Sequence, residues 1–208
     1  MIPAIIPAAG LSRRMGRPKL ILPIRRRGQS DGDAITVIET VIQAFRYGGC
    51  DYVGVVAPPI ERPESAEVVR SASRAGAEVW IPSEQPPDMR SSLLFGLREL
   101  ERRGIPPFVL IAPGDAIGMT ADVVVRCLRA ALAEPDRLVV PICQGQRGHP
   151  LVLPWRCVEE IRALPPDLGV NAVVRRHENE IRLEPVDDPM IVEDLDVPDD
   201  YERWRGED

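Results

Sequence analysis

Residues 2–10, Ile-Pro-Ala-Ile-Ile-Pro-Ala-Ala-Gly, form the stretch from which the fold can be worked out. The apolar run over residues 2–8 has the length of a buried strand, and it ends at Gly10 and a polar turn. Four later runs have a similar length and β-branched content, so we expect them to be interior strands of the same sheet. These runs cover residues 52–57, 78–81, 108–112 and 138–142.

Segments with the spacing of amphipathic helices lie between the predicted strands. They cover residues 37–45, 66–75, 91–102 and 121–132. This alternation is typical of right-handed βαβ crossovers, and it predicts a Rossmann-like, three-layer α/β/α sandwich with a mainly parallel sheet. Because ligands bind at the carboxyl ends of such strands, we expect the glycine-containing turns after Ala8 and Ala112 to face one ligand together.

Length and proline distribution set the domain organisation. The chain has 208 residues, enough for one domain with a sizeable core, so we predict a single domain over residues 1–208. We expect residues 144–208 to form an accessory layer and residues 25–33 to form a surface loop or hairpin. The prolines that break the pattern in the later part are Pro150, Pro154, Pro165 and Pro166.

The composition excludes several classes of function. A hydrophobic fraction of 44% and a charged fraction of 28% are ordinary for a globular chain. The net charge of -6 argues against a protein that grips duplex DNA through many phosphates, so we expect no nucleic-acid partner. The sequence has no run of 18 apolar residues and no signal peptide, so we expect no membrane partner and a cytoplasmic location.

The cysteines are widely separated and form no C-x-x-C pair. This pattern indicates neither a zinc site nor a disulfide framework, and we expect buried thiols in a reducing compartment. The cysteines are Cys50, Cys127, Cys143 and Cys157. His177 lies in a charged stretch and is expected at the surface.

The segment with the most chemical information is Pro7-Ala8-Ala9-Gly10-Leu11-Ser12-Arg13-Arg14-Met15-Gly16-Arg17-Pro18-Lys19. Its small residues at positions 8–10 let a ligand approach the backbone, where N–H groups can bind phosphate oxygens. Ser12 adds a hydroxyl donor, while Arg14 and Lys19 would neutralise the β- and γ-phosphates and the departing pyrophosphate. The spacing matches neither G-x-G-x-x-G nor G-x-x-x-x-G-K-[ST]. The alternative interpretation is a strand-to-helix turn with stray basic residues.

A second polar turn, Pro113-Gly114-Asp115, follows the predicted strand at residues 108–112. It puts a carboxylate at the carboxyl end of that strand. A hard oxygen ligand suits Mg²⁺, which would bridge triphosphate oxygens and stabilise charge at the α-phosphorus. Because a Gly-Asp turn is common by itself, the metal role of Asp115 depends on its pairing with the first loop.

The segment over residues 7–19 resembles the L-A-A-G-x-S-x-R-M-G-x-x-K signature of the molybdenum cofactor nucleotidyltransferases, with Pro7 replacing the first Leu. The resemblance implies a nucleotide-diphospho-sugar transferase type of fold and catalytic roles for Arg14, Lys19 and Asp115. The Ala-Ala-Gly at positions 8–10 is similar to the cytidylyltransferase branch rather than the Ala-Gly-Gly of the guanylyltransferase branch, which implies CTP. By this resemblance the nucleotide contacts Pro7, Ala8, Ala9, Gly10, Leu11, Ser12, Arg13, Arg14 and Lys19.

Three later segments extend the resemblance, in the family's order, as far as Tyr201. Gly148-His149-Pro150 is similar to the G-x-x-G-H-P segment of the cytidylyltransferase branch, which implies contacts with the acceptor. Residues 193–201 are similar to a D-I-D-T-P-E-D-Y close, which implies that Asp196 or Asp194 completes the Mg²⁺ shell. Residues 89–97 are similar to a segment that lines the base, which implies nucleotide contacts by Ser92 and Gly96.

The sequence departs from the family pattern at two positions, and several matches have structural alternatives. Ile117 stands where the G-D-x-P metal motif has Pro, and Asp88 stands where the base-lining segment has Gly. His149 could instead anchor its turn, Ser92 could belong to a helix cap, and Pro198 could begin a helix.

Together the residues and the resemblance predict a Mg²⁺-dependent nucleotidyltransferase. The implied reaction transfers CMP from CTP to the phosphate of molybdopterin and releases pyrophosphate, with residues 1–143 as the nucleotide-binding core and residues 144–208 as acceptor-side and C-terminal elements. Alternatives are a related enzyme that uses GTP or a sugar or alditol phosphate, and a non-catalytic chaperone for the cofactor. The expected partners are CTP or another nucleoside triphosphate, a phosphorylated pterin and a recipient molybdoenzyme, and we expect a monomer.

Overall fold

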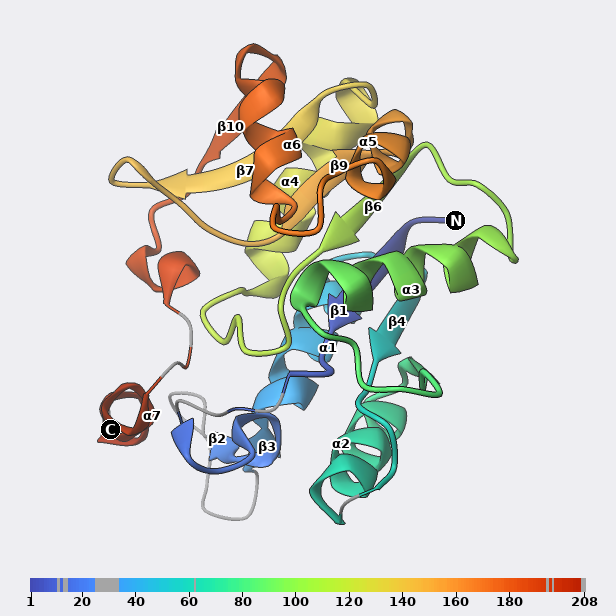
Figure 1. Ribbon diagram of the computed structural model, residues 1–208. Helices are drawn as coiled ribbons and strands as arrows, with labels where there is room; N and C mark the ends of the chain where they lie inside the picture. The colour runs from blue at the N-terminus through green and yellow to red at the C-terminus, as the bar shows by residue number, and fades with distance from the viewer. Residues whose placement is uncertain are drawn as a thin grey trace.

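The computed structural model describes residues 1–10, 12, 15–24, 34–61, 63–193, 195 and 197–206. The chain forms a three-layer α/β/α sandwich around one eight-stranded sheet, as the alternation of strands and helices predicts (Figure 1). The strand order is β10-β7-β9-β6-β1-β4-β5, and β8 pairs with β7. The bounds are β1 Pro3–Pro7, β4 Tyr52–Val56, β5 Glu78–Trp80, β6 Phe108–Ile111, β7 Leu138–Cys143, β8 Gln146–Arg147, β9 Leu151–Pro154 and β10 Ile181–Pro185.

The sheet contains all five predicted strands, and most of its pairs are parallel. Strand β1 pairs in parallel with both β4 and β6, β4 pairs in parallel with β5, and β7 pairs in parallel with β10. Strand β9 is antiparallel and lies between β6 and β7. The expectation of an accessory layer after residue 143 is therefore wrong. Pro150 and Pro154 do not break the sheet because they stand just before and at the end of β9, where a missing N–H is tolerated.

Helices cover both faces of the sheet, and all four predicted helices are present. Buried residues of α1, α2 and α4 pack on one face, and those of α3, α5 and α6 pack on the other, nearer the viewer in Figure 1. The bounds are α1 Val37–Tyr47, α2 Pro63–Arg74, α3 Met89–Glu101, α4 Ala121–Ala133, α5 Val158–Arg162, α6 Asn171–Arg176 and α7 Pro198–Gly206. Short 3-10 helices are η2 Lys19–Ile21, η4 Trp155–Cys157, η5 Glu178–Glu180 and η6 Pro189–Val192.

Strand β1 is apolar on both sides because both sides are covered. Ala4 and Ile6 belong to the core that includes α1 and α4, whereas Ile5 belongs to the core under α3. All three residues are fully buried. This two-sided burial explains why the strand is a continuous apolar run rather than an alternating one.

Asp88 fixes the start of α3. Its carboxylate accepts a hydrogen bond from the backbone N–H of Ser91, with a distance of 2.6 Å between Asp88 Oδ1 and Ser91 N. That bond satisfies one of the N–H groups left free at a helix N-terminus. The aspartate in place of the family's glycine therefore has a local structural role.

The C-terminal helix lies beside a small antiparallel ribbon formed by an early part of the chain (Figure 1). Strands β2 (Pro23–Ile24) and β3 (Ile35–Thr36) form the ribbon, and the predicted loop at residues 25–33 lies outside the described residues. Helix α7 lies beside it, because the Tyr201 hydroxyl donates to the Pro23 carbonyl oxygen at 2.8 Å (Figure 1). The Arg17 guanidinium lies 4.7 Å from the centre of the Tyr201 ring.

On its way to that position, the C-terminal segment packs closely against two glycines, Gly118 and Gly148. A Cβ at Gly118 would lie 1.6 Å from the Met190 carbonyl oxygen, and a Cβ at Gly148 would lie 2.5 Å from the Ile191 carbonyl oxygen. Residues 118 and 148 must therefore lack side chains for η6 to lie against them. Within the described part of the chain, no helix has both the length and the apolar character needed to cross a membrane.

Candidate functional site

A cavity of about 460 Å³ opens where β1 and β6 end. Its size is in the range of small-molecule sites. Strands β1 and β6 are direct parallel neighbours, with Ile5 opposite Ile111, so the turns that follow them lie at the same edge of the sheet. The lining residues are Pro7, Ala8, Ala9, Gly10, Ser12, Met15, Lys19, Leu20, Gln85, Pro86, Pro87, Asp88, Met89, Ser92, Gly114 and Asp115.

The turn after β1 offers backbone to this cavity. Ala8 and Ala9 are buried, and Ala8 continues the sheet by donating its N–H to the Val56 carbonyl oxygen at 2.9 Å. Apart from its chain neighbours, no described residue has an atom within 4 Å of a Cβ placed at Gly10. These residues leave the space next to the Gly10 backbone open to a ligand, and their packing does not require a glycine there.

Ser12 stabilises the same turn through hydrogen bonds of its side chain and its backbone. Its hydroxyl oxygen accepts a hydrogen bond from the backbone N–H of Lys19 at 3.2 Å, and its carbonyl oxygen accepts one from Met15 at 3.1 Å. The φ angle of Ser12 is +48°, in the left-handed region. Ser12 thus ties the start of the loop to Lys19, at its end.

Lys19 and Asp115 form an ion pair at the cavity wall, although 96 positions separate them in the sequence. Their side chains are only 16% and 14% exposed. The Lys19 ammonium also donates to the Leu195 carbonyl oxygen at 2.6 Å. Lys19 is the only lysine in the sequence, and every other side chain counted as Lys or Arg is an arginine. A compact ammonium therefore lies between two acceptor oxygens from distant segments.

The turn that carries Asp115 forms without the family's proline. The N–H of Ile117 donates to the Asp115 carbonyl oxygen at 2.8 Å, and the N–H of Ala116 donates to the Pro113 carbonyl oxygen at 3.3 Å. Because Ile117 has an N–H that proline lacks, the substitution supplies a hydrogen bond within the turn. The departure from the motif leaves the carboxylate at the cavity.

The antiparallel direction of β9 brings His149 to the same edge of the sheet. Ile111 at the end of β6 lies opposite Leu151 at the start of β9, so the residues just before β9 adjoin those just after β6. The Nδ1 atom of His149 is buried and has no hydrogen-bond partner among the residues that the structure describes. Burial lowers the pKa of His149, and the nearby Asp115 carboxylate only partly opposes this. The imidazole is therefore neutral near pH 7, with one ring nitrogen available to a ligand.

The two predicted nucleotide contacts on α3, Ser92 and Gly96, have different surroundings. Ser92 lines the cavity, and its buried hydroxyl has no hydrogen-bond partner in the described part of the chain. Gly96, one turn later, does not line the cavity. A Cβ there would lie 2.9 Å from methyl carbons of both Ile5 and Val56, so the absence of a side chain at Gly96 allows α3 to pack on the sheet.

Gln85 was not identified from the sequence. Its amide nitrogen donates to the Ala9 carbonyl oxygen at 2.6 Å, and its side chain lines the cavity. The residue stands in a proline-containing turn after β5, at the carboxyl end of a strand. That strand-end position was the available signal, because it is shared by the other polar groups of the site.

Five of the predicted site residues fall outside the described residues: Leu11, Arg13, Arg14, Asp194 and Asp196. Leu195 is described, and its contact with Lys19 brings the C-terminal segment to the cavity wall.

All four cysteines are free and buried, as predicted. The expectation of a surface position for His177 is wrong, because its side chain is only 13% exposed and lies between two glutamates.

Residues 4–181 match the family model described as a MobA-like NTP transferase domain. No curated protein has a sequence that matches the chain significantly.

Several solved structures share the fold over nearly the whole chain. A nucleotidyl transferase from Methanothermobacter, Mth528, has a TM-score of 0.76 at 24% identity, with 99% of this chain and 96% of that chain covered. Rv0371c from Mycobacterium tuberculosis H37Rv has a TM-score of 0.74 at 22% identity, with 98% and 95% covered. A CMP:2-keto-3-deoxy-manno-octonic acid synthetase complexed with CTP has a TM-score of 0.68 at 14% identity, with 98% and 96% covered. At these identities the likeness establishes the nucleotidyltransferase fold.

Proposed function

Because the chain belongs to the MobA-like NTP transferase domain family, we propose that it transfers CMP from CTP to the terminal phosphate of molybdopterin and releases pyrophosphate. The observation that carries this proposal is the cavity where the open backbone at Gly10, the Lys19 ammonium and the Asp115 carboxylate meet. Family membership supports a nucleoside triphosphate as one substrate. The choice of CTP and of the pterin acceptor is our inference.

The triphosphate would lie along the turn after β1. Backbone N–H groups next to small side chains can approach phosphate oxygens closely, and the space beside Gly10 is open. Lys19 would contact the β- and γ-phosphates, and we assign Arg14 the same task from the sequence. Leu11, Ser12 and Arg13 would complete the loop around the phosphates.

The donor set of the site fits a divalent cation such as Mg²⁺. The Lys19 ammonium lies beside a carboxylate oxygen of Asp115 and the carbonyl oxygen of Leu195. Both are hard oxygen ligands of the kind that Mg²⁺ prefers. We propose Asp115 as a ligand, with Asp196 or Asp194 as a second. When bound there, the ion would supply positive charge to the triphosphate oxygens. A structural neighbour, Rv0371c, has been solved as a complex with manganese.

The reaction needs no nucleophile from the protein. An oxygen of the acceptor phosphate would form a bond to the α-phosphorus of CTP, while the bond from that phosphorus to the bridging oxygen of the β-phosphate breaks. The bonding electrons leave with pyrophosphate, whose charge Lys19 would neutralise. Catalysis then depends on alignment of the two phosphates and on the fixed charges of the site.

The base and acceptor ends of the site would be read by different elements. Ser92 offers an unpaired hydroxyl on the cavity wall, and we propose that it contacts the nucleotide. His149, with its unpaired Nδ1, would hold the acceptor together with Gly148 and Pro150. In this view residues 1–143 bind the nucleotide and residues 144–208 contribute to the acceptor side. Release of the product to a molybdoenzyme would follow.

A pyrophosphate assay tests the proposal directly. The purified chain would be incubated with Mg²⁺, each of the four ribonucleoside triphosphates in turn, and molybdopterin, a sugar phosphate or an alditol phosphate. We expect pyrophosphate only with CTP and the pterin. Turnover with GTP would overturn the argument from Ala9, and turnover with the other acceptors alone would reassign the acceptor. No pyrophosphate with any pair would favour a non-catalytic cofactor carrier.

A further inference from the structure

Three metal-binding side chains meet on the α5–α6 side of the sheet, away from the cavity. Cys157 ends η4, Glu160 lies in α5, and His177 follows the last residue of α6. A thiol sulfur, a carboxylate oxygen and an imidazole nitrogen from these residues all lie within 4.8 Å of one another. Among the residues that the structure describes, no other trio of potential metal ligands comes together in this way.

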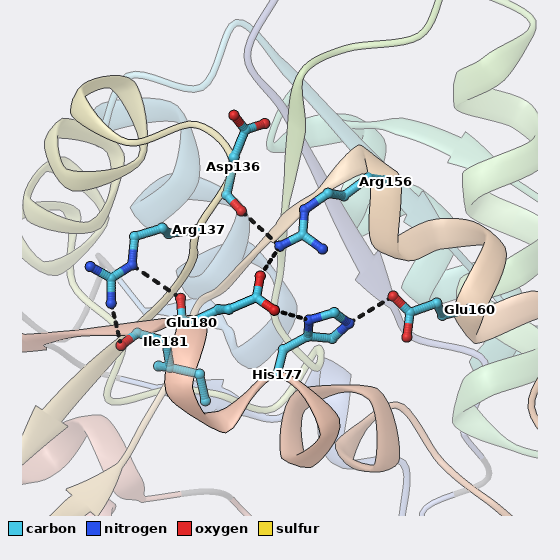
Figure 2. A network of polar contacts seen from close by, with 7 residues as sticks. All are labelled: Asp136, Arg137, Arg156, Glu160, His177, Glu180 and Ile181. Atoms are coloured by element: carbon cyan, nitrogen blue, oxygen red, sulfur yellow. Dashed lines mark hydrogen bonds and ion pairs between the residues drawn. The ribbon is translucent and has the colours of Figure 1, made fainter.

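A second carboxylate, that of Glu180, contacts the ring nitrogen of His177 that does not face Glu160. Its Nδ1 lies 2.9 Å from Glu180 Oε1, while its Nε2 lies 2.7 Å from Glu160 Oε1 (Figure 2). Glu180 is fixed in turn by an ion pair with Arg156. A carboxylate that binds one ring nitrogen of a histidine and leaves the other toward the ligands is the usual support of a metal-binding histidine.

The surroundings keep this arrangement rigid. Arg156 also donates to the Asp136 carbonyl oxygen at 3.0 Å, and Arg137 donates to the carbonyl oxygens of Glu180 and Ile181 at 3.2 Å each (Figure 2). Cys157 is fully buried. Cys157 is therefore held by packing, and the backbone at Glu180, which supports His177, is held by hydrogen bonds from Arg137.

The donor set and its spacing suit a zinc-type ion. Sulfur, nitrogen and oxygen ligands at about 2.0–2.3 Å in a tetrahedron stand about 3.3–3.8 Å apart. The ligand atoms lie within 4.8 Å of one another, so the longest separation needs to close by about 1 Å or less. The hydrogen bond of 2.7 Å between His177 Nε2 and Glu160 Oε1 has to open to admit the ion. Both movements are within reach of rotation about side-chain bonds. Mg²⁺, which prefers oxygen ligands, would not select this set.

Metal binding at this cluster would release protons. A divalent ion binds the thiolate of Cys157 and an unprotonated ring nitrogen of His177, so both residues would have to be deprotonated at their binding atoms.

We propose that Cys157, Glu160 and His177 form a second metal site that binds one zinc-type cation, with a water molecule completing the tetrahedron. The ion would fasten α5 to the segment that leads into β10, an edge strand of the sheet. Its role is structural, and it is independent of the proposed nucleotidyl transfer.

Cobalt titration of the full chain, after removal of metals with a chelator, tests this site. Thiolate-bound Co²⁺ has a charge-transfer band in the near ultraviolet, whereas Co²⁺ on oxygen ligands such as Asp115 has none. We expect the band to saturate at one equivalent, to be displaced by Zn²⁺, and to be lost in Cys157→Ser. It should persist in Cys127→Ala, a matched control at a buried thiol on the other side of the sheet.

Two surface substitutions keep the test decisive if Cys157→Ser does not fold. We expect Glu160→Gln and Glu180→Gln each to raise the dissociation constant for Co²⁺ by about 10–100-fold, and Glu159→Gln, at a neighbouring exposed residue, to leave it unchanged. Absence of the band in the folded wild-type chain would overturn the proposal. So would equal affinity in Glu160→Gln and the wild type, which would leave the cluster as an ion-pair network without a metal.

Discussion

The carboxylates of Glu39 and Asp115 are both shielded from water and both paired with a cation, but they differ in what surrounds them. Glu39 lies in the first turn of α1, where one oxygen accepts from the Thr36 N–H at 2.7 Å and the Thr36 hydroxyl at 2.8 Å, and the other accepts from Arg74 at 2.8 Å. Asp115 faces a cavity and meets a lysine from a remote loop. The first carboxylate is satisfied by neighbouring elements and stabilises the fold, whereas the second is arranged for a ligand.

Asp115→Asn should have the largest effect on activity. Loss of the carboxylate charge removes the proposed metal ligand, and we expect a fall of about a thousandfold or more in kcat/KM while the thermal midpoint changes little. Pyrophosphate release and thermal unfolding measured on the same preparation check this. Asp122→Asn, at an exposed carboxylate of α4, is the control and should keep full activity. Undiminished turnover in Asp115→Asn would remove the metal assignment.

Lys19→Met should follow, with a loss of about a hundredfold in kcat/KM and weaker CTP binding, because the departing charge is no longer neutralised. Lys19→Arg sharpens the test. A planar guanidinium does not fit where a compact ammonium meets Asp115 and Leu195, so we expect it to restore only part of the activity. Titration calorimetry with CTP and steady-state kinetics separate binding from turnover. Wild-type affinity in Lys19→Met would contradict the role at the phosphates.

Glu39→Gln should lower the free energy of unfolding by about 1–2 kcal/mol and leave kcat/KM unchanged. Burial alone would raise the pKa of Glu39, but the hydrogen bonds from Arg74 and Thr36 outweigh it, and the pKa lies below its usual value of 4.5. The stabilisation is therefore present above pH 4.5 and is lost as the pH falls through the folded-state pKa.

Denaturant unfolding of the wild type and of Glu39→Gln at a series of pH values checks this dependence. The difference between the two proteins should shrink as the pH falls below 4.5. Glu61→Gln, at an exposed residue, is the control and should match the wild type throughout. A constant difference across the acid range would show that the charge of Glu39 is not what stabilises α1.

Among the variants expected to change activity, Tyr201→Phe should have the smallest effect. The hydroxyl that it removes holds α7 to the β2–β3 ribbon, and thereby supports the segment whose Leu195 carbonyl contacts Lys19. We expect KM for CTP to rise by about threefold to tenfold, in keeping with one lost hydrogen bond, with kcat nearly unchanged. Tyr47→Phe, at a tyrosine that is 72% exposed, is the control. A fall in kcat with constant KM would mean that Tyr201 does not act through this contact.

Much of the architecture was predictable because periodicity and strand ends carry local information. The apolar runs and the alternation with helices predicted the parallel strands and placed the turns at Gly10 and Asp115 on one edge. The insertion of β9 was not predictable from periodicity, since a run of four residues with a terminal proline has no marker of direction or neighbour. That insertion is what brings His149 to the site.

Other residues were assigned to a plausible segment but not to the right side of it. Ser92 and Gly96 lie one turn apart on α3, yet only Ser92 lines the cavity, because the Gly96 position is packed on Ile5 and Val56. His177 was expected in solvent because its neighbours in sequence are charged. Its partners Glu160 and Glu180 enclose it instead, and contacts between elements of this kind leave no pattern in a single sequence.

The path of η6 over Gly118 and Gly148 limits how this protein could be redesigned. Any side chain at either glycine would collide with the backbone of residues 190 and 191. The collision would displace η6 and, with it, Leu195. Randomised libraries aimed at a new acceptor should therefore keep both glycines and diversify the exposed tip at residues 144–147, which has solvent to grow into.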